Sequence, residues 1–169
     1  MKKIVILGPE STGKSTLARQ LADHYGTIWV TEYAREYLDA LDRPYEAFDL
    51  LEIAKGQIAL EEEGVLHAND IVICDTNLWV IKVWSDYKYG TTHKWIEDQI
   101  KLRRYDYYML TDIDVPWKSD PQREHPNERS ELLQIYKQHL SNQPVPFAWL
   151  RGGEEIRFRE AIERIDFLV

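Results

Sequence analysis

The chain has a single cysteine among its 169 residues, so no disulfide bond can form within it. Its longest apolar runs, such as Ile4–Leu7, have about four residues, whereas a membrane-spanning helix needs about 20. The N-terminus carries two lysines but no apolar signal-peptide region. These absences predict a cytoplasmic protein without membrane attachment, and the length suits a single domain over residues 1–169.

Positive charge is also scarce, because 21 Lys and Arg face 29 Asp and Glu and leave a net charge of -8. General binding to nucleic acid or to an anionic membrane needs a basic surface, so neither partner is expected. The basic run Lys101–Arg104 is too short to change this expectation, and Glu61–Glu63 is interpreted as a solvent-exposed helix face. The five histidines lack the spacing of a zinc site.

Short β-branched runs alternate with longer amphipathic stretches, which predicts an α/β fold with a parallel sheet. Several runs are almost continuously apolar, as expected for strands that are covered on both faces. The expected strands are Ile4–Leu7, Thr27–Val30, Ile71–Cys74, Tyr107–Leu110 and Pro146–Leu150.

Helical periodicity connects these runs. Apolar residues recur at helical spacing over Leu17–Tyr25 and again over Phe158–Ile165. Pro126 suits the first turn of a helix that runs to about Leu140. Before it, Asp114–Asn127 contains three prolines and several charged residues, so we expect an exposed loop there.

A phosphate-binding loop is predicted by the sequence GPESTGKS, which fits the pattern G-x-x-x-x-G-K-[ST] after a strand and before a helix. Glycines let successive backbone N–H groups turn inward toward phosphate oxygens. Lys14 would bring positive charge to the terminal phosphates, and the Ser15 hydroxyl would bind Mg²⁺. The expected nucleotide contacts are Gly8, Glu10, Ser11, Thr12, Gly13, Lys14, Ser15 and Thr16.

An acidic residue, Asp75, follows the third expected strand, where open α/β sheets bind ligands. Its carboxylate could hold Mg²⁺ through water or accept a proton from a hydroxyl group. Alternatively it could cap the following helix, although Thr76 and Asn77 could share that task.

A second cluster, TEYAREY, follows the second expected strand. Glu32 could accept a proton or bind ribose hydroxyls, Arg35 could bind a phosphate, and Tyr33 could stack on a ring. The alternative is a solvated first helical turn, in which Glu32 is favoured by the helix dipole.

Two arginines flank the segment EHPNE, at the end of the proline-rich loop, and could bring positive charge onto a transferring phosphoryl group. Arg123 and Arg129 are the candidates, and surface ion pairs with Glu124, Glu128 and Glu131 are the alternative.

Two further side chains could reach a ligand. Trp79 could contact a ring, although aromatic residues at helical spacing more often belong to the core. Arg151 could pass near an adenine, or could simply belong to a strand-to-helix turn.

The segments GPESTGKS, TEYAREYL, IAKGQ, CDT, VPWKSDPQRE and VPFAWLRG follow one another over nearly the whole chain. This ordered set resembles the ribosylnicotinamide kinase domain of the bifunctional bacterial NMN adenylyltransferase/ribosylnicotinamide kinases, in particular its stand-alone P-loop, ATPase-like relatives. The resemblance implies a nucleoside/nucleotide kinase fold, with a five-stranded parallel sheet in the order 2-3-1-4-5, flanking helices and a flexible lid at about 114–130. It also implies ATP, Mg²⁺ and phosphorylation of the 5′-hydroxyl of nicotinamide riboside.

Residue by residue, the resemblance implies that Lys14, Asp75, Glu32 and Arg123 are catalytic, with Ser15 and Asp75 at the metal. Thr31 stands where that family has a ring-stacking tryptophan, and Asn77, which we expect at the substrate, stands where it has a second acid. Two alternatives stay open beside a riboside kinase. One is a nucleoside monophosphate kinase in which Arg35 binds the acceptor phosphate, and the other is a nucleotide-dependent switch that acts through a protein partner.

Overall fold

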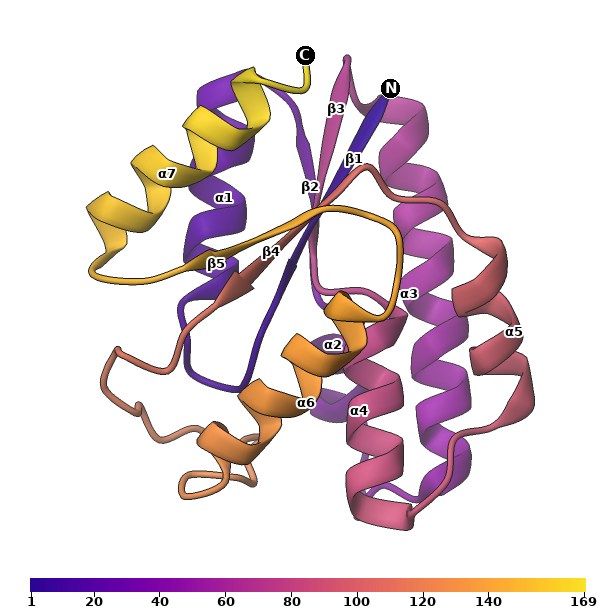
Figure 1. Cartoon of the computed structure of the whole chain (residues 1–169). Helices are drawn as coiled ribbons and strands as arrows, with labels where there is room; N and C mark the ends of the chain where they lie inside the picture. Colours follow the sequence, from indigo (N-terminus) through magenta and orange to yellow (C-terminus); the bar gives the residue numbers. More distant parts are fainter.

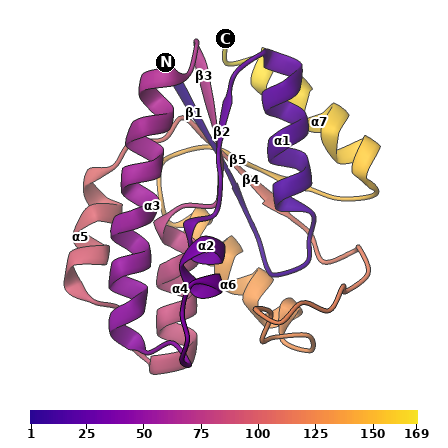
Figure 2. The same ribbon diagram turned by 180° about the vertical axis from the view of Figure 1, so that it is seen from behind.

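A computed structural model describes all 169 residues and contains five strands and seven helices. The order of elements is β1 (Lys2–Leu7), α1 (Lys14–Tyr25), β2 (Ile28–Val30), α2 (Tyr33–Asp39), α3 (Ala47–His67), β3 (Ile71–Asp75), α4 (Leu78–Tyr89), α5 (Lys94–Leu102), β4 (Tyr107–Thr111), α6 (Arg129–Ser141), β5 (Phe147–Leu150) and α7 (Glu154–Asp166). The helices cover both faces of the sheet (Figures 1 and 2). None of them has the length and apolar character required to cross a membrane.

The sheet is parallel and has the order β2-β3-β1-β4-β5, which confirms the predicted topology. Strand β1 is central, and its residues Ile4–Leu7 are completely buried. Ile4 lies opposite Ile73 of β3 on one side and Tyr107 of β4 on the other. A strand that is hydrogen-bonded on both edges and covered on both faces must be apolar throughout, which explains the uninterrupted run.

Two helical layers cover the faces of the sheet. Helices α1 and α7 pack side by side on one face, and α3, α4, α5 and α6 lie on the other (Figure 1). In the first layer Leu17, Leu21, Ala161 and Ile165 are buried in one apolar cluster. The helical periodicity predicted for both segments is therefore confirmed.

The predicted start of the sixth helix is wrong, because α6 begins at Arg129 and Pro126 precedes it in a loop. The backbone N–H groups of Glu124 and His125 point at the carboxylate of Glu10, at 3.1 and 3.2 Å. These hydrogen bonds hold the residues around Pro126 away from a helical course, which a local pattern could not reveal.

The interpretation of Glu61–Glu63 is also wrong in one position, because Glu61 is buried with 2% of its surface exposed. Its carboxylate accepts hydrogen bonds from Lys3 (3.0 Å), Arg103 (3.0 Å) and Tyr105 (2.7 Å). A buried carboxylate needs hydrogen-bond donors, and these three side chains supply them. These partners come from distant parts of the chain and could not be inferred from the run itself.

The carboxyl ends of the central strands meet at one edge of the sheet. Gly8 follows β1, Asp75 ends β3 and Thr111 ends β4. Asp75 lies opposite Ile6 of β1, and the main-chain N–H of Thr76 donates to the Ile6 carbonyl. Ligands of open α/β sheets bind at this edge, so the topology places the acidic residue beside the glycine-rich loop.

Candidate functional site

The loop between β1 and α1 has the backbone conformation of a phosphate-binding loop. Gly8, Ser11 and Gly13 have positive φ angles of 148°, 56° and 81°. A side chain at Gly8 would collide with Thr111, so glycine is required there. Gly13 precedes α1 without a side-chain cap, which leaves the first N–H groups of that helix available to an anion.

The loop is braced from the last helix by a buried arginine. Arg157 of α7, with 4% of its surface exposed, donates to the carbonyl of Thr12 at 2.6 Å and to that of Asp112 at 3.0 Å. It also pairs with the carboxylate of Asp114. Sequence reasoning did not identify this residue, because only its apolar neighbours on α7 carry the helical signal.

Lys14 folds back over the loop that precedes it. Its ammonium group donates a hydrogen bond to the carbonyl of Pro9 at 2.9 Å. Burial lowers the pKa of Lys14, while the negative charges of Glu32 and Asp75 act in the opposite direction. The lysine therefore lies between the loop and two carboxylates, where an anionic phosphate would stabilise its charge.

Asp75 is almost completely buried, and its Oδ1 atom has no hydrogen-bond partner. Burial raises the pKa of Asp75 to about 6, and the charge of Glu32 acts in the same direction against the lowering effects of Ser15 and Lys14. Ser15 and Asp75 together offer a hydroxyl and a carboxylate, the hard oxygen ligands that Mg²⁺ prefers. The unpartnered buried oxygen fits such a cation site.

The alternative role of Asp75 as a helix cap is wrong. Asn77 caps α4, because its side-chain oxygen accepts the N–H of Trp79 at 3.0 Å. Asp75 is the last residue of β3, and its side chain is left for another task.

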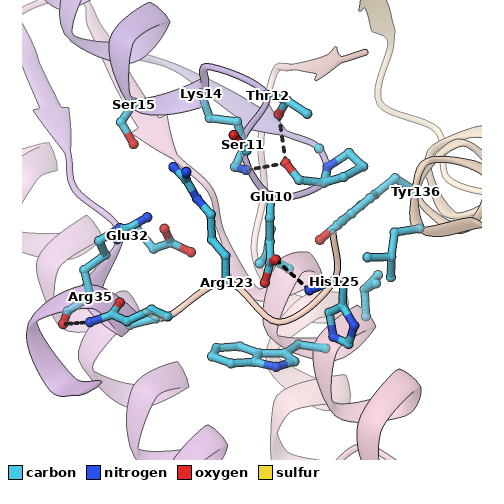
Figure 3. Close-up of a pocket in the computed structure, with 18 of the residues that line it drawn as sticks. Glu10, Ser11, Thr12, Lys14, Ser15, Glu32, Arg35, Arg123, His125 and Tyr136 are labelled. Atoms are coloured by element: carbon cyan, nitrogen blue, oxygen red, sulfur yellow. Dashed lines mark hydrogen bonds between the residues drawn. The ribbon is translucent and has the colours of Figure 1, made fainter. Parts of the chain in front are cut away.

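A pocket of about 180 Å³ opens beside the phosphate loop (Figure 3). It lies among the loop, α2, α4, α6 and the segment that precedes α6. Its lining consists of residues 8–16, Glu32, Ala34, Arg35, Leu38, Val80, Val83, Trp84, Tyr87, Gln122, Arg123, His125, Leu132 and Tyr136.

Three predicted residues outside the loop share this pocket: Glu32, Arg35 and Arg123. Glu32 precedes α2, but its side chain makes no capping hydrogen bond, so the carboxylate is not used by the helix. The Arg35 guanidinium pairs with Asp120 at 2.7 Å. Figure 3 shows Arg123 reaching toward the phosphate loop, with Glu32 beside it.

The proline-rich segment is tied directly to the phosphate loop. The Glu10 carboxylate accepts two of its backbone N–H groups, as described above, and Ser11 Oγ accepts the N–H of Lys118 at 2.8 Å. Arg129 adds a third tie, because it donates to the carbonyl of Ser11 at 3.2 Å.

The two arginines of this segment do not form the surface ion pairs that were considered as an alternative. Arg123 bonds the Lys118 carbonyl and lies over the ring of Trp117, 6.0 Å from its centroid. Arg129 lies over the same ring at 5.6 Å. Neither guanidinium lies within ion-pair distance of a glutamate, and only Arg123 lines the pocket.

Five predicted site residues lie outside the pocket lining: Tyr33, Asp75, Asn77, Trp79 and Arg151. The Tyr33 ring packs directly against Gly56 of α3, where a side chain would collide with it. Arg151 pairs with Asp112 at 3.3 Å and lies over the ring of Trp149.

Asn77 and Trp79 are turned away by the geometry of α4. Asn77 is 1% exposed, and its amide donates to the hydroxyl of Tyr108 at 3.4 Å. The Trp79 ring stacks on His139 of α6, with centroids 4.8 Å apart. Asn77 therefore faces β4 and Trp79 faces α6, and neither side chain lines the pocket beside the phosphate loop.

An aromatic wall that sequence reasoning missed completes the pocket. Trp84, Tyr87, His125 and Tyr136 line it, and the rings of Tyr87 and His125 meet edge to face at 5.1 Å. The signal was present in the sequence, because the α4 residues 80, 83, 84 and 87 follow helical spacing. These residues could not be recognised as a ligand surface, because the sequence does not show which face of α4 the pocket occupies.

Comparison with known families and proteins gives matches over nearly the whole chain. A family model described as an AAA domain matches residues 3–157. The trifunctional NAD biosynthesis/regulator protein NadR of Escherichia coli K12 is 26% identical over 98% of this chain, and that of Salmonella typhimurium LT2 is 25% identical over the same share. The chain spans 42% of the length of each of these relatives.

Solved structures share the fold. A NadR protein in complex with NAD and AMP-PNP superposes with a TM-score of 0.77 at 23% identity, covering 97% of this chain and 48% of the other. A NadR protein in complex with NR gives 0.76 at 22% identity, covering 97% and 50%. Thymidylate kinase from Ehrlichia chaffeensis gives 0.69 at 15% identity, covering 97% and 98%.

Proposed function

The chain belongs to the AAA domain family, and from this premise we propose that it is an ATP-dependent nucleoside kinase. Its acceptor would be the 5′-hydroxyl of nicotinamide riboside or of a related nucleoside. The observation that carries the proposal is the shared pocket, in which the phosphate loop, Glu32, Arg123 and an aromatic wall face the same space. The likeness to NadR proteins, which include complexes with NR and with AMP-PNP, supports this choice of substrates.

The donor side would be formed by the phosphate loop. Its inward N–H groups and the start of α1 bind phosphate oxygens, and Lys14 would exchange its bond to Pro9 for a phosphate. Ser15 and Asp75 would hold Mg²⁺, which when bound with ATP neutralises charge on the phosphates. The unpartnered oxygen of Asp75 is consistent with this assignment.

The acceptor side would use Glu32 as the group that receives the hydroxyl proton. Glu32 lines the pocket, whereas Asp75 is almost completely buried at the end of β3 and does not. Asp75 would therefore bind the metal, and Glu32 would accept the proton from the acceptor hydroxyl. Arg123, which reaches toward the phosphate loop in the same pocket, would stabilise negative charge on the transferring group.

The aromatic wall would bind the base of the nucleoside. Trp84, Tyr87 and Tyr136 offer ring faces or edges in the same pocket as Glu32. A pyridinium ring such as nicotinamide is a cation, and cations are attracted to aromatic faces. These residues could replace the stacking tryptophan for which this chain has Thr31.

The segment at about 114–130 would act as a flexible lid. It contributes Arg123 and His125 to the pocket, and its ties to the phosphate loop run through Glu10, Ser11 and Arg129. Such a segment can exclude water from the transferring phosphoryl group while it is closed.

The test is an incubation of the protein with Mg-ATP and separate acceptors, with products identified by mass spectrometry. The acceptors are nicotinamide riboside, other nucleosides and nucleoside monophosphates. A phosphorylated riboside supports the proposal. Transfer only to monophosphates would favour the monophosphate kinase, in which Arg35 would have to leave Asp120 to bind a phosphate. Slow ATP hydrolysis with every acceptor unmodified would favour the nucleotide switch.

The cytoplasmic location and the absence of a nucleic-acid partner remain predictions from composition. The net charge of -8 supports the second of them.

A further inference from the structure

A second cavity, of about 450 Å³, lies on another side of α4. It is bounded by α4, by the end of α5 with the residues that follow it, and by the turn at residues 143–145 before β5. These elements can be followed in Figure 1. The cavity shares no residue with the pocket beside the phosphate loop, and its size is within the range of small-molecule sites.

The cavity is basic, although the protein as a whole is acidic. Its lining includes four cationic side chains and a single carboxylate, Glu97. Glu97 is neutralised by Lys82 at 3.0 Å, and Arg103 is paired with a buried glutamate. Lys101 and Arg104 are exposed and form no ion pair. Two unpaired cations therefore remain at the cavity to attract an anion.

The rest of the lining is largely aromatic and apolar, with rings held in place from behind. Trp79 is stacked on His139, and the hydroxyl of Tyr108 accepts the Asn77 amide at 3.4 Å. Tyr105 is anchored by its 2.7 Å hydrogen bond to the buried Glu61. Ring surfaces that are fixed before binding lose little conformational entropy when a flat ligand packs against them.

We propose that this cavity is a second ligand site, separate from the phosphate-loop pocket, for a flat ring that carries an anionic group, such as a mononucleotide. The ring packs against the aromatic lining formed by Trp79, Tyr105 and Tyr108. The anionic group binds Lys101 and Arg104, which form no ion pair, although Arg104 donates a hydrogen bond to the Lys101 carbonyl at 2.9 Å. This site is independent of the identity of the phosphoryl acceptor.

The two pockets are connected by one helix. Trp79 and Lys82 of α4 line the second cavity, whereas Val80, Val83 and Trp84 of the same helix line the first. A ligand in either pocket therefore contacts α4 directly.

The tryptophans of α4 provide a test that reads both pockets at once. The donor side of the first pocket is filled with saturating Mg-AMP-PNP, AMP is titrated in, and the indole N–H signals of Trp79 and Trp84 are followed by NMR. The Trp84 signal reports any AMP that binds on the acceptor side of the first pocket. The two signals are assigned from the Trp79→Phe and Trp84→Phe variants. We expect AMP to shift the Trp79 signal in a saturable way. This shift should persist after the first pocket is saturated and the Trp84 signal has stopped changing.

Two further probes separate the parts of the ligand. Adenosine has the ring without the anion, and inorganic phosphate has the anion without the ring. Each should bind at least about tenfold more weakly than AMP, because it lacks one of the two sets of contacts. An equal response to inorganic phosphate would overturn the proposal, since the cavity would then hold only an anion.

Charge-reversal variants supply the matched control. The Lys101→Glu/Arg104→Glu protein should lose at least about tenfold in AMP affinity at Trp79. The Arg19→Glu/Arg159→Glu protein changes net charge equally at exposed, unpaired cations on α1 and α7 and should bind AMP as the wild type does. An unchanged Trp84 signal verifies that each variant is folded. Equal losses in both variants, or no Trp79 response to AMP, would contradict the proposal.

Discussion

The carboxylate of Glu10 accepts a hydrogen bond from the backbone N–H of His125 at 3.2 Å, and so joins the phosphate loop to the segment before α6. The neighbouring N–H of Glu124 points at the same carboxylate at 3.1 Å. Hydrogen bonds to a charged acceptor are stronger than those between neutral groups. Glu10 occupies one of the variable positions of the loop pattern, yet its side chain helps to attach the proposed lid to the loop.

Replacing Glu10 by alanine should release this attachment. Hydrogen exchange of the Glu124 and His125 amides should become at least about tenfold faster, because two charge-assisted hydrogen bonds are lost. Glu10→Gln keeps an acceptor oxygen and should give an intermediate rate. Unchanged exchange in the alanine variant would mean that other contacts hold the segment closed.

Lys14→Ala should abolish most phosphoryl transfer. Removal of one preorganised charge from such a site costs about 10² to 10³ in rate. The measurement is product formation from Mg-ATP and the accepted nucleoside, and Arg19→Ala on the same helix is the control. Full activity in Lys14→Ala would show that the loop does not serve a phosphoryl transfer.

Asp75→Asn should make the protein more stable and less active. The pKa of Asp75 is raised by burial to about 6 from an ordinary value of 3.8, so between these pH values the folded state keeps a proton that the unfolded state has lost. The contribution of Asp75 to the free energy of unfolding therefore falls as the pH rises from about 4 to about 6, by roughly 3 kcal/mol in total.

Denaturant unfolding of wild type and Asp75→Asn at pH 4 and pH 7 tests this sign. The stability difference in favour of the variant should be small at the lower pH and larger at the higher one. Wild-type activity should decline below about pH 6, where the carboxylate becomes protonated and binds a metal less well. A variant that is less stable at neutral pH would indicate a hydrogen-bonding role instead.

Glu32→Gln should lower the rate of transfer while leaving ATP affinity nearly unchanged. The carboxylate lines the pocket and makes no capping bond, so its loss should remove proton acceptance without disturbing α2. General-base contributions are typically about 10² to 10⁴ in rate. Comparing kcat with ATP binding measured by calorimetry separates the two effects, and an unchanged kcat would assign the proton to another group.

Gly56→Ala should destabilise the fold by about 1–3 kcal/mol, because the Tyr33 ring occupies the space that the methyl group needs. The Gly56→Ala/Tyr33→Ala double variant removes the collision, so its cost should be less than the sum of the single costs. Thermal unfolding of the four proteins completes the cycle. Additive losses would show that the two residues do not interact.

The sheet could be anticipated from the sequence because its strands are set by local composition. Runs such as Ile4–Leu7 must be covered on both faces, and their alternation with amphipathic segments leaves few arrangements. The phosphate loop was equally accessible, since the conformations at Gly8 and Gly13 depend on residue types at fixed spacing. The order of the strands was implied by the family resemblance and not by the residues alone.

The pocket walls could not be anticipated in the same way. Trp79 and Trp84 belong to one helix and look alike in the sequence, but only the second lines the pocket beside the phosphate loop. Tyr33 was expected at a ligand because of its position after β2, yet Gly56 offers its ring a place in the interior. Such choices depend on how helices pack against one another, which periodicity does not specify.

Because Arg157 holds the phosphate loop, the loop can reach its final conformation only after the last helix has been synthesised. The carbonyl of Thr12 to which it donates lies 145 residues earlier in the chain. On the ribosome the glycine-rich segment therefore emerges long before the guanidinium that holds it, and at about 5–20 residues per second the delay is several seconds or more. A nascent chain whose α7 has not yet been synthesised would therefore already contain the glycine-rich loop, but without the hydrogen bond from Arg157 that holds the loop in its final shape.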